Sequence, residues 1–171
     1  GGQKKGCGFP VAHLLAAFEA GGGLVLEMIA SALRTHDLAQ VNKIHPQLRA
    51  GDVLVADRGF CSFAHLALIR RHGLHACLRV HQKQIVNFEP HRPHAVSQKR
   101  AKGLPRSRWL RSLGPLDQGV EWIKPDDPPG WMSAEDYAAL PASIEIRELR
   151  YRIGTPGFRT REVTLATTLL D

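Results

Sequence analysis

The sequence predicts a mixed α/β fold, and three observations carry that prediction. A short apolar run over residues 53–56 ends at Asp57 and is typical of a central strand that is buried on both faces of a sheet. Residues 62–73 then have the cap, apolar stripe and final glycine of a helix. Residues 74–80 alternate between apolar and polar, as a half-buried strand does. Because a strand, a helix and a strand in succession form a right-handed crossover, we expect these two strands to be parallel.

Two further apolar runs, residues 11–20 and 24–33, precede these elements and are joined by three consecutive glycines at 21–23. Glycine adopts positive φ angles without steric cost, so the runs are expected to form an antiparallel hairpin. Their alanine and leucine content would also suit helices. The hairpin interpretation places two antiparallel strands before the parallel pair.

Both helices expected in this half carry end signals. Asp37 and Gln40 have the spacing of a capping box, and Pro46 should end or kink the helix that follows. Ser62 is the expected N-cap of the second helix, and Gly73 can take the left-handed conformation at its end. The predicted order over residues 11–80 is therefore strand, strand, helix, strand, helix, strand.

The second half of the chain is predicted to be rich in strands. From His81 to about Pro115 the periodicity is lost, which indicates an irregular basic segment. A short capped helix should begin at Ser133, and the alternation slips at Arg147–Glu148, which predicts a β-bulge. Strands are expected over residues 118–124, 143–153 and 161–170.

Composition indicates a soluble globular protein with 43% apolar residues. No apolar run approaches the roughly 18 residues that span a bilayer, and the start of the chain lacks the apolar core of a signal peptide. The three cysteines are widely spaced and suggest neither a disulfide framework nor a zinc site, so a reducing cytoplasm is expected. The chain has no initiator methionine and stops abruptly at Asp171, which we interpret as a piece of a longer protein.

The positive charge is concentrated in one stretch. Residues 79–111 contain nine Lys or Arg and one acid, Glu89, a local +8 within a net charge of +7 that leaves about −1 for the rest. Such a block is either a solvated face or a track that binds phosphates.

Asp57 is the candidate site residue that the local pattern suggests. Ligands of open α/β sheets bind at the carboxyl ends of the strands, where Asp57 is expected to lie. Asp52, five residues earlier, should face the opposite side of the strand. An Asp-x-Gly sequence after a strand is equally typical of a plain turn, and this motif alone does not separate the two interpretations.

Four segments resemble a known family in their order and context: residues 6–11, 33–38, 51–60 and 147–153. They are similar to bacterial insertion-sequence transposases of the IS-four group, which carry a DDE catalytic domain. The resemblance implies a ribonuclease-H-like mixed sheet with a β-rich insertion. Residues 1–80 would be a partial catalytic core, and residues 81–171 a basic arm and the insertion.

By this resemblance Asp57 would be a catalytic residue and metal ligand, the second acid of an Asp, Asp, Glu triad. The first Asp is expected upstream of Gly1 and the Glu beyond Asp171, so the fragment alone is expected to be inactive. Two Mg²⁺ (or Mn²⁺) ions, completed by residues outside this chain, would support cleavage of transposon ends and strand transfer. The implied partners are double-stranded DNA and a second copy on that DNA, with no membrane, in the bacterial cytoplasm at the nucleoid.

Basic residues are the candidates for contact with DNA, because each neutralised phosphate adds to affinity. A surface role is at least as good an interpretation of Arg58, which is expected to point away from Asp57. Trp109, Trp122 or Trp131 could stack on a flipped base, as the family's insertion does, but each also suits a core. The candidate DNA-binding residues are Arg58, Lys99, Arg100, Lys102, Arg106, Arg108, Trp109 and Arg111.

The histidines are not expected to bind a metal or to take part in catalysis. His91 and His94 have a spacing seen in metal sites, but on a basic loop that contains proline we expect them to be solvated. His36 is expected to assist a helix cap rather than a catalytic site. Two rival functions stay open at this point: a ribonuclease-H-like nuclease that cuts without joining, and a non-catalytic DNA-binding remnant of a decayed element.

Overall fold

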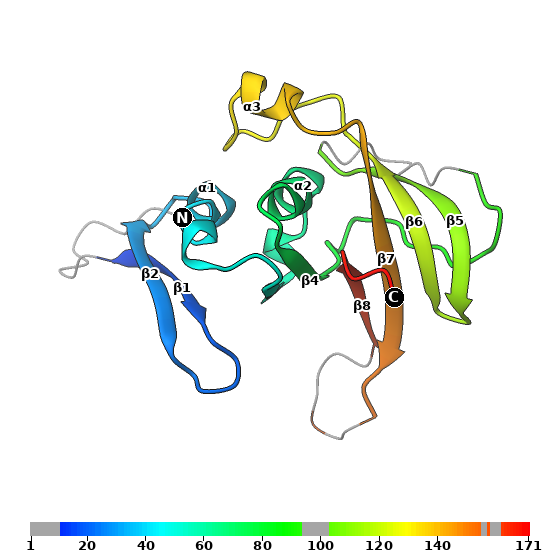
Figure 1. The fold of residues 1–171 in the computed structure, drawn as a ribbon, viewed down its shortest axis with the longest axis horizontal. Coiled ribbons are helices and arrows are strands. Elements are labelled where there is room, and N and C mark those ends of the chain that lie inside the picture. Colours follow the sequence, from blue (N-terminus) through cyan, green and yellow to red (C-terminus); the bar gives the residue numbers. More distant parts are fainter. Residues whose placement is uncertain (1–10, 94–102, 155–156, 158–161) are drawn as a thin grey trace, which may run out of the picture. The chain divides into compact units, whose positions relative to one another are not determined.

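The computed structural model describes residues 11–93, 103–154, 157 and 162–171. The chain divides into two compact units, Gly1–Gln47 and Leu48–Asp171. The second unit holds a six-stranded mixed sheet with few helices, so the predicted α/β class is confirmed and is compatible with a ribonuclease-H-like fold (Figure 1). The division into parts predicted near residue 80 stays a prediction.

The first unit contains the predicted antiparallel hairpin. Strands β1 (Ala12–Phe18) and β2 (Val25–Ala32) pair along their length. Gly23 has a φ of +71°, the left-handed conformation that glycine adopts freely. The Glu19 carboxylate accepts hydrogen bonds from two backbone N–H groups of the glycine turn, which lower the pKa of Glu19.

The capping box predicted for the first helix does not form. Helix α1 (Leu38–Val41) is a single turn, and Asp37 makes no side-chain hydrogen bond to its described backbone. The Asp37 carboxylate instead lies 2.9 Å from Nε2 of His13 on β1, a partner that local spacing could not reveal. His36 takes the capping role, as expected, because its Nδ1 accepts the Leu38 N–H at 3.3 Å.

The predicted role of Pro46 as the end of that helix is also wrong. Helix α1 stops at Val41, and Pro46 lies inside a following 3₁₀ turn, η1 (His45–Gln47). The Gln47 N–H bonds to the Ile44 carbonyl at 2.9 Å and so closes this turn around the proline. A proline fits near the start of a helical turn, because the backbone N–H that it lacks has no partner there.

The second unit is built on one sheet with the strand order β3-β4-β8-β7-β6-β5. Strands β3 and β4 are parallel, as the crossover rule predicted, and the other neighbours are antiparallel. Helix α3 (Ala134–Ala138) begins after Ser133 as expected. The strands are β3 (Val53–Ala56), β4 (His75–Arg79), β5 (Arg106–Gly114), β6 (Asp117–Ile123), β7 (Ser143–Arg152) and β8 (Glu162–Thr167).

Helix α2 (Phe63–Arg71) connects the parallel strands and has both of its predicted end signals. The Ser62 hydroxyl accepts the His65 N–H at 3.3 Å. At the other end Gly73 has a φ of +71°, and its N–H bonds to the Arg70 carbonyl while the Leu74 N–H bonds to the Ile69 carbonyl, each at 3.0 Å. These two bonds form a Schellman motif, which turns the chain directly into β4.

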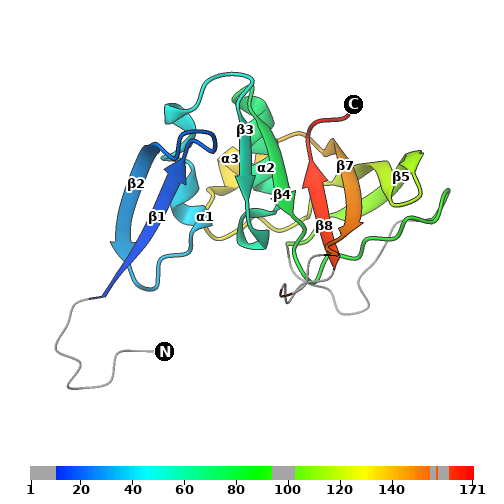
Figure 2. The same ribbon diagram turned by 90° about the horizontal axis from the view of Figure 1, so that it is seen from below.

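The core of this unit lies between α2 and one face of the sheet (Figure 2). Phe63, Leu66 and Ile69 are the buried stripe of α2. They belong to one apolar cluster with side chains from β4, β6, β7 and β8, namely Ala76, Leu78, Val120, Trp122, Ile144, Ile146 and Ala166. This packing holds the carboxyl ends of β3 and β4 at one edge.

The prediction that residues 53–56 form a central strand buried on both faces is wrong. Strand β3 is an edge strand in the described part of the sheet, where it pairs with β4. Val53 is 44% and Val55 72% exposed. An unbroken apolar run shows that a strand can be buried, but which neighbours cover it is decided by the tertiary arrangement.

Two predictions for the second half also need correction. The basic segment over 81–115 is not irregular throughout, because Arg106–Gly114 forms β5. No register shift occurs at Arg147–Glu148 in the described pairings of β7, and the irregularities lie in β5 instead. The apparent slip arises because the charged side chain of Glu148 faces the core in the same alternation as Ile144 and Ile146. No helix among the described residues is long and apolar enough to cross a membrane.

Candidate active site at the end of strand β3

Asp57 follows β3 directly, at the carboxyl edge where it was predicted. The next residues form a 3₁₀ turn, η2 (Arg58–Phe60), and the Asp57 carbonyl accepts the Phe60 N–H at 3.0 Å. The Asp57 carboxylate does not cap this turn within the described chain, and its side chain is 66% exposed. The backbone of Asp57 therefore makes the turn, while its carboxylate remains accessible to a ligand.

Two arginines approach this carboxylate. Arg79 Nη1 lies 3.9 Å and Arg58 Nε 4.0 Å from Asp57 Oδ1. Arg79 comes from β4, whose parallel register pairs Leu78 with Ala56 and so places the next residues side by side. Arg58 was predicted to point away from Asp57 along a continuing strand, but the strand ends at Ala56 and η2 turns Arg58 back. Exposed pairs at this distance are weak, so both guanidinium groups can accept another anion.

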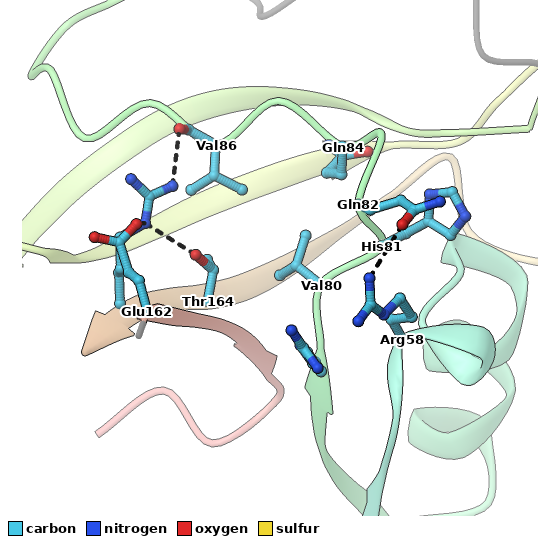
Figure 3. Close-up of a pocket in the computed structure, with 10 residues that line it drawn as sticks. Arg58, Val80, His81, Gln82, Gln84, Val86, Glu162 and Thr164 are labelled. Atoms are coloured by element: carbon cyan, nitrogen blue, oxygen red, sulfur yellow. Dashed lines mark hydrogen bonds and ion pairs between the residues drawn. The ribbon is translucent and has the colours of Figure 1, made fainter. Parts of the chain in front are cut away.

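A pocket of about 220 Å³ opens beside these residues (Figure 3). Arg58 and Arg79 line this pocket and also lie near the Asp57 carboxylate, which is not itself part of the lining, so the two arginines connect the pocket to Asp57. The rest of the lining comes from β7, β8 and the segment after β4: Val80, His81, Gln82, Gln84, Val86, Arg150, Glu162 and Thr164.

The charges in this pocket are unequally compensated. Arg150 Nε donates to Thr164 Oγ1 at 2.9 Å and lies 3.4 Å from Glu162 Oε1. Arg58 is oriented by a neutral side chain, because its Nη1 donates to Gln82 Oε1 at 3.1 Å (Figure 3). The Arg150 end of the pocket therefore has an acid close to its guanidinium group, whereas among the described residues the acid nearest to Arg58 is Asp57, at the longer distance of 4.0 Å.

His81 is a partly buried histidine in the lining of this pocket. Burial, together with the charges of Lys83 and Arg58, lowers the pKa of His81 below its usual value of 6.5. The imidazole is therefore neutral at physiological pH, and a bound anion would favour its protonation.

The described residues do not by themselves form a metal site. They contain no group of three or more His, Cys, Asp or Glu side chains that could hold a metal ion. Asp57 can supply carboxylate oxygens, the donors that Mg²⁺ and Mn²⁺ prefer, but the adjacent guanidinium groups oppose a cation held by that carboxylate alone.

The other predicted DNA-binding residues do not join Asp57. Arg106, Arg108, Trp109 and Arg111 lie on β5, at the opposite edge of the sheet from β3. Arg108 pairs with Glu121 and Arg111 with Glu145, so acids on β6 and β7 partly compensate their charges. Lys99, Arg100 and Lys102 lie outside the described residues.

The tryptophans occupy three different environments. Trp122 is a core residue at 1% exposure, so it cannot stack on a base without unfolding. Trp131 is half-buried against the same core. Trp109 packs on the ring of His91 with 4.4 Å between the ring centroids. His91 itself is exposed, as expected of a solvated residue, and His94 lies outside the described residues.

Arg79 and Arg150 are site residues that sequence reasoning missed. A signal for Arg79 existed, since two parallel strands joined by one helix end at the same edge, and the residue after Leu78 must then lie near the residue after Ala56. No comparable signal existed for Arg150, which reaches the pocket from β7, a strand far along the chain.

Comparison with known proteins identifies a family for most of the chain. A family model described as a transposase DDE domain matches residues 1–150, a stretch that includes Asp57, Arg58, Arg79 and Arg150. Searches among curated proteins and among solved structures found no match.

Proposed function

Because this chain belongs to the transposase DDE-domain family, we propose that Asp57 is one of the carboxylates with which the enzyme cuts and joins DNA. The observation that carries the proposal is the position of Asp57. Its side chain lies accessible at the carboxyl edge of two parallel strands, beside a pocket with unequally compensated arginines. Ligands of α/β sheets bind at this edge.

Asp57 would supply one ligand to Mg²⁺ or Mn²⁺. Such ions, when bound, stabilise charge on the attacking and leaving oxygens of a phosphodiester. By the resemblance to insertion-sequence transposases, the other two acids of the Asp, Asp, Glu triad would complete this metal site from parts of the transposase outside this chain. The transposition reaction would then comprise cleavage at the transposon ends and strand transfer into target DNA.

Arg58 and Arg79 would bind a DNA phosphate next to Asp57. A carboxylate and a phosphodiester repel each other, and two guanidinium groups between them offset that repulsion. Their separations from Asp57 of 4.0 and 3.9 Å leave hydrogen-bond donors available for phosphate oxygens on both guanidinium groups, apart from the Arg58 Nη1 donor that is bonded to Gln82. The pocket would thereby position the DNA backbone at the catalytic carboxylate.

Wider DNA contacts would come from the basic arm, Lys99, Arg100 and Lys102, and from Arg106 on β5, with smaller contributions from Arg108 and Arg111 because of their ion pairs. Trp109 is the candidate among the described tryptophans for stacking on a base, since it lies on this strand at half burial. A dimer on DNA would bring two transposon ends together.

A related nuclease that cuts without joining is the rival that the site chemistry also fits, because both reactions use the same acids. A strand-transfer assay on the intact transposase separates the two. Joined products support transposition, whereas nicks without joining support the nuclease.

The test of Asp57 is Asp57→Asn in the intact transposase. The amide keeps the volume of the side chain and removes its charge, so we expect DNA cleavage to fall by at least about 10²-fold, as when a transition-state stabilising group is lost. DNA affinity should change little. Asp52→Asn at the other end of β3 is the matched control, because Asp52 accepts the Arg49 N–H in a turn. Wild-type cutting by Asp57→Asn would exclude the proposed role.

A further inference from the structure

Glu148 is a carboxylate in the core of the sheet. It lies on β7, is 0% exposed, and takes the inward position that Ile144 and Ile146 occupy earlier on the strand. Burial raises the pKa of Glu148, which expresses the cost of holding a charge away from water. An apolar side chain of similar volume at such a position is often neutral or stabilising, so packing alone does not account for this acid.

The partners of Glu148 compensate its burial. Trp122 Nε1 donates to Oε1 at 2.9 Å, and Gln118 Nε2 donates to Oε2 at 2.8 Å. The positive charges of Arg92 and Arg150 also act on the carboxylate and oppose the rise in the pKa of Glu148. Arg92 is itself buried at 7% exposure, an unusual place for a guanidinium group.

Three of these partners hold the backbone of a single segment. Gln118 Nε2 and Arg92 Nε donate to the Asn87 carbonyl at 2.9 and 2.7 Å. Arg150 Nη2 donates to the neighbouring Val86 carbonyl at 3.5 Å (Figure 3). The Arg150 guanidinium also lies over the ring of Phe88, 5.1 Å from its centroid. The side chains around Glu148 therefore meet on residues 86–88.

That segment continues directly from the wall of the pocket. Residues 80–86, here called the wall segment, contribute Val80, His81, Gln82, Gln84 and Val86 to the pocket lining. The wall segment has no strand or helix; backbone hydrogen bonds from Val80 to Thr164 and from Gln84 to His81 hold its first part, and the side chains of Arg92, Gln118 and Arg150 hold the chain where it ends, at residues 86–87. Glu148 does not line the pocket, but Arg150 does.

We propose that Glu148 is a positioning residue for the DNA-phosphate pocket: through Gln118, Arg92 and Arg150 it holds the wall segment in the shape that presents Gln82 and Arg58 beside Asp57. The inference rests on the proposed function, because it assumes that this pocket binds a DNA phosphate. An apolar residue at 148 could fill the core but could not orient two arginines and an amide.

Glu148→Gln is the variant that tests the link. It keeps the volume of the side chain, but its amide N–H₂ would face either the Trp122 N–H or the Gln118 N–H₂, and both are donors. Gln118 could accept from it only by turning its Oε1, an atom without a hydrogen-bond partner among the described residues, and would then lose its bond to Asn87. Glu145→Gln is the matched control, since Glu145 lies on the same strand and pairs with Arg111.

The first measurement is amide hydrogen exchange on the intact transposase without DNA. In Glu148→Gln we expect residues 81–88 to exchange about tenfold faster, as after removal of a charge-assisted hydrogen bond, and β1 and β2 to exchange as in the wild type. Glu145→Gln should exchange as the wild type does throughout. If Glu148→Gln does not fold, Gln118→Leu cuts the same link and leaves the carboxylate facing Arg92 and Trp122. Wild-type exchange of the wall segment in the variant that folds would overturn the proposal.

The second measurement is DNA binding at several salt concentrations, with Arg79→Met alongside. We expect Glu148→Gln to raise Kd about tenfold and to lower the log–log salt slope by about 0.9. In the double variant Glu148→Gln/Arg79→Met, Kd and the salt slope should differ little from those of Arg79→Met alone, because both substitutions affect the contact with one phosphate. If Arg79→Met leaves DNA binding unchanged, the phosphate role of the pocket fails, and hydrogen exchange still decides whether Glu148 positions the wall. If Arg79→Met weakens binding and Glu148→Gln does not, the positioning role fails alone.

Discussion

Arg79 lies beside Asp57 across the parallel strands, with its Nη1 3.9 Å from the Asp57 Oδ1. Asp57 directly follows β3 and Arg79 is the last residue of β4, and the register of the two strands pairs Ala56 with Leu78. A carboxylate and a guanidinium at this separation attract each other without the geometry of a strong pair. In the proposed function, Arg79 would exchange this weak contact with the carboxylate for a hydrogen bond to a phosphate oxygen when DNA binds.

Removing the arginine charge should weaken DNA binding in a salt-dependent way. We expect Arg79→Met to lower the log–log slope of DNA affinity against salt by about 0.9, because one phosphate is no longer neutralised by the protein. Arg71→Gln is the charge-matched control, since Arg71 is exposed at the end of α2 and does not line the pocket. Equal slopes for Arg79→Met and the wild type would contradict the phosphate role.

The basic arm and β5 should contribute unequally. Changing Lys99, Arg100 and Lys102 together to Gln should lower the salt slope by as much as about 0.9 for each phosphate that these side chains neutralise. Changing Arg108 and Arg111 to Gln should lower it less, because these residues already pair with Glu121 and Glu145. Binding titrations at several salt concentrations, from low to moderate, measure the salt slope of each variant. A slope that the arm variant leaves unchanged would identify the arm as a solvated face.

The His81 imidazole should make the free protein less stable in mild acid. Its pKa in the folded state is lowered by burial and by Lys83 and Arg58, so below the unfolded value of about 6.5 the unfolded chain binds a proton that the folded chain resists. The stabilisation is present above that pH and is lost as the pH falls through the folded pKa. Denaturant unfolding at pH 7.5 and 5.5 should show a smaller loss of stability for His81→Gln than for the wild type. An equal loss would mean that His81 titrates normally.

Local signals predicted the elements whose stabilising contacts lie close in the chain. The glycine turn at 21–23 led to the β1–β2 hairpin, and Ser62 and Gly73 marked both ends of α2. In each case the groups that satisfy the backbone are within a few residues of one another, so the sequence window contains the whole interaction.

The failed predictions share the opposite property. Asp37 at capping-box spacing bonds instead to His13, which lies 24 residues away along the chain. The charge of Glu148 suggested that the alternation of the strand slips there, because charged side chains are rarely buried. Its partners Gln118 and Trp122 come from another strand. Such contacts depend on which strands become neighbours, and the spacing of residues along the chain does not show which strands will pair.

The sequence by itself determined the α/β class, the parallel crossover and the place of Asp57 at a strand end, because periodicity, caps and chirality act over short distances. Only the tertiary structure decided that β3 lies at an edge of the described sheet, that Arg58 and Arg79 lie near Asp57, and that Glu148 is buried against Gln118 and Trp122. Those features arise where residues distant in sequence meet, and the pairing order of the strands sets their distances.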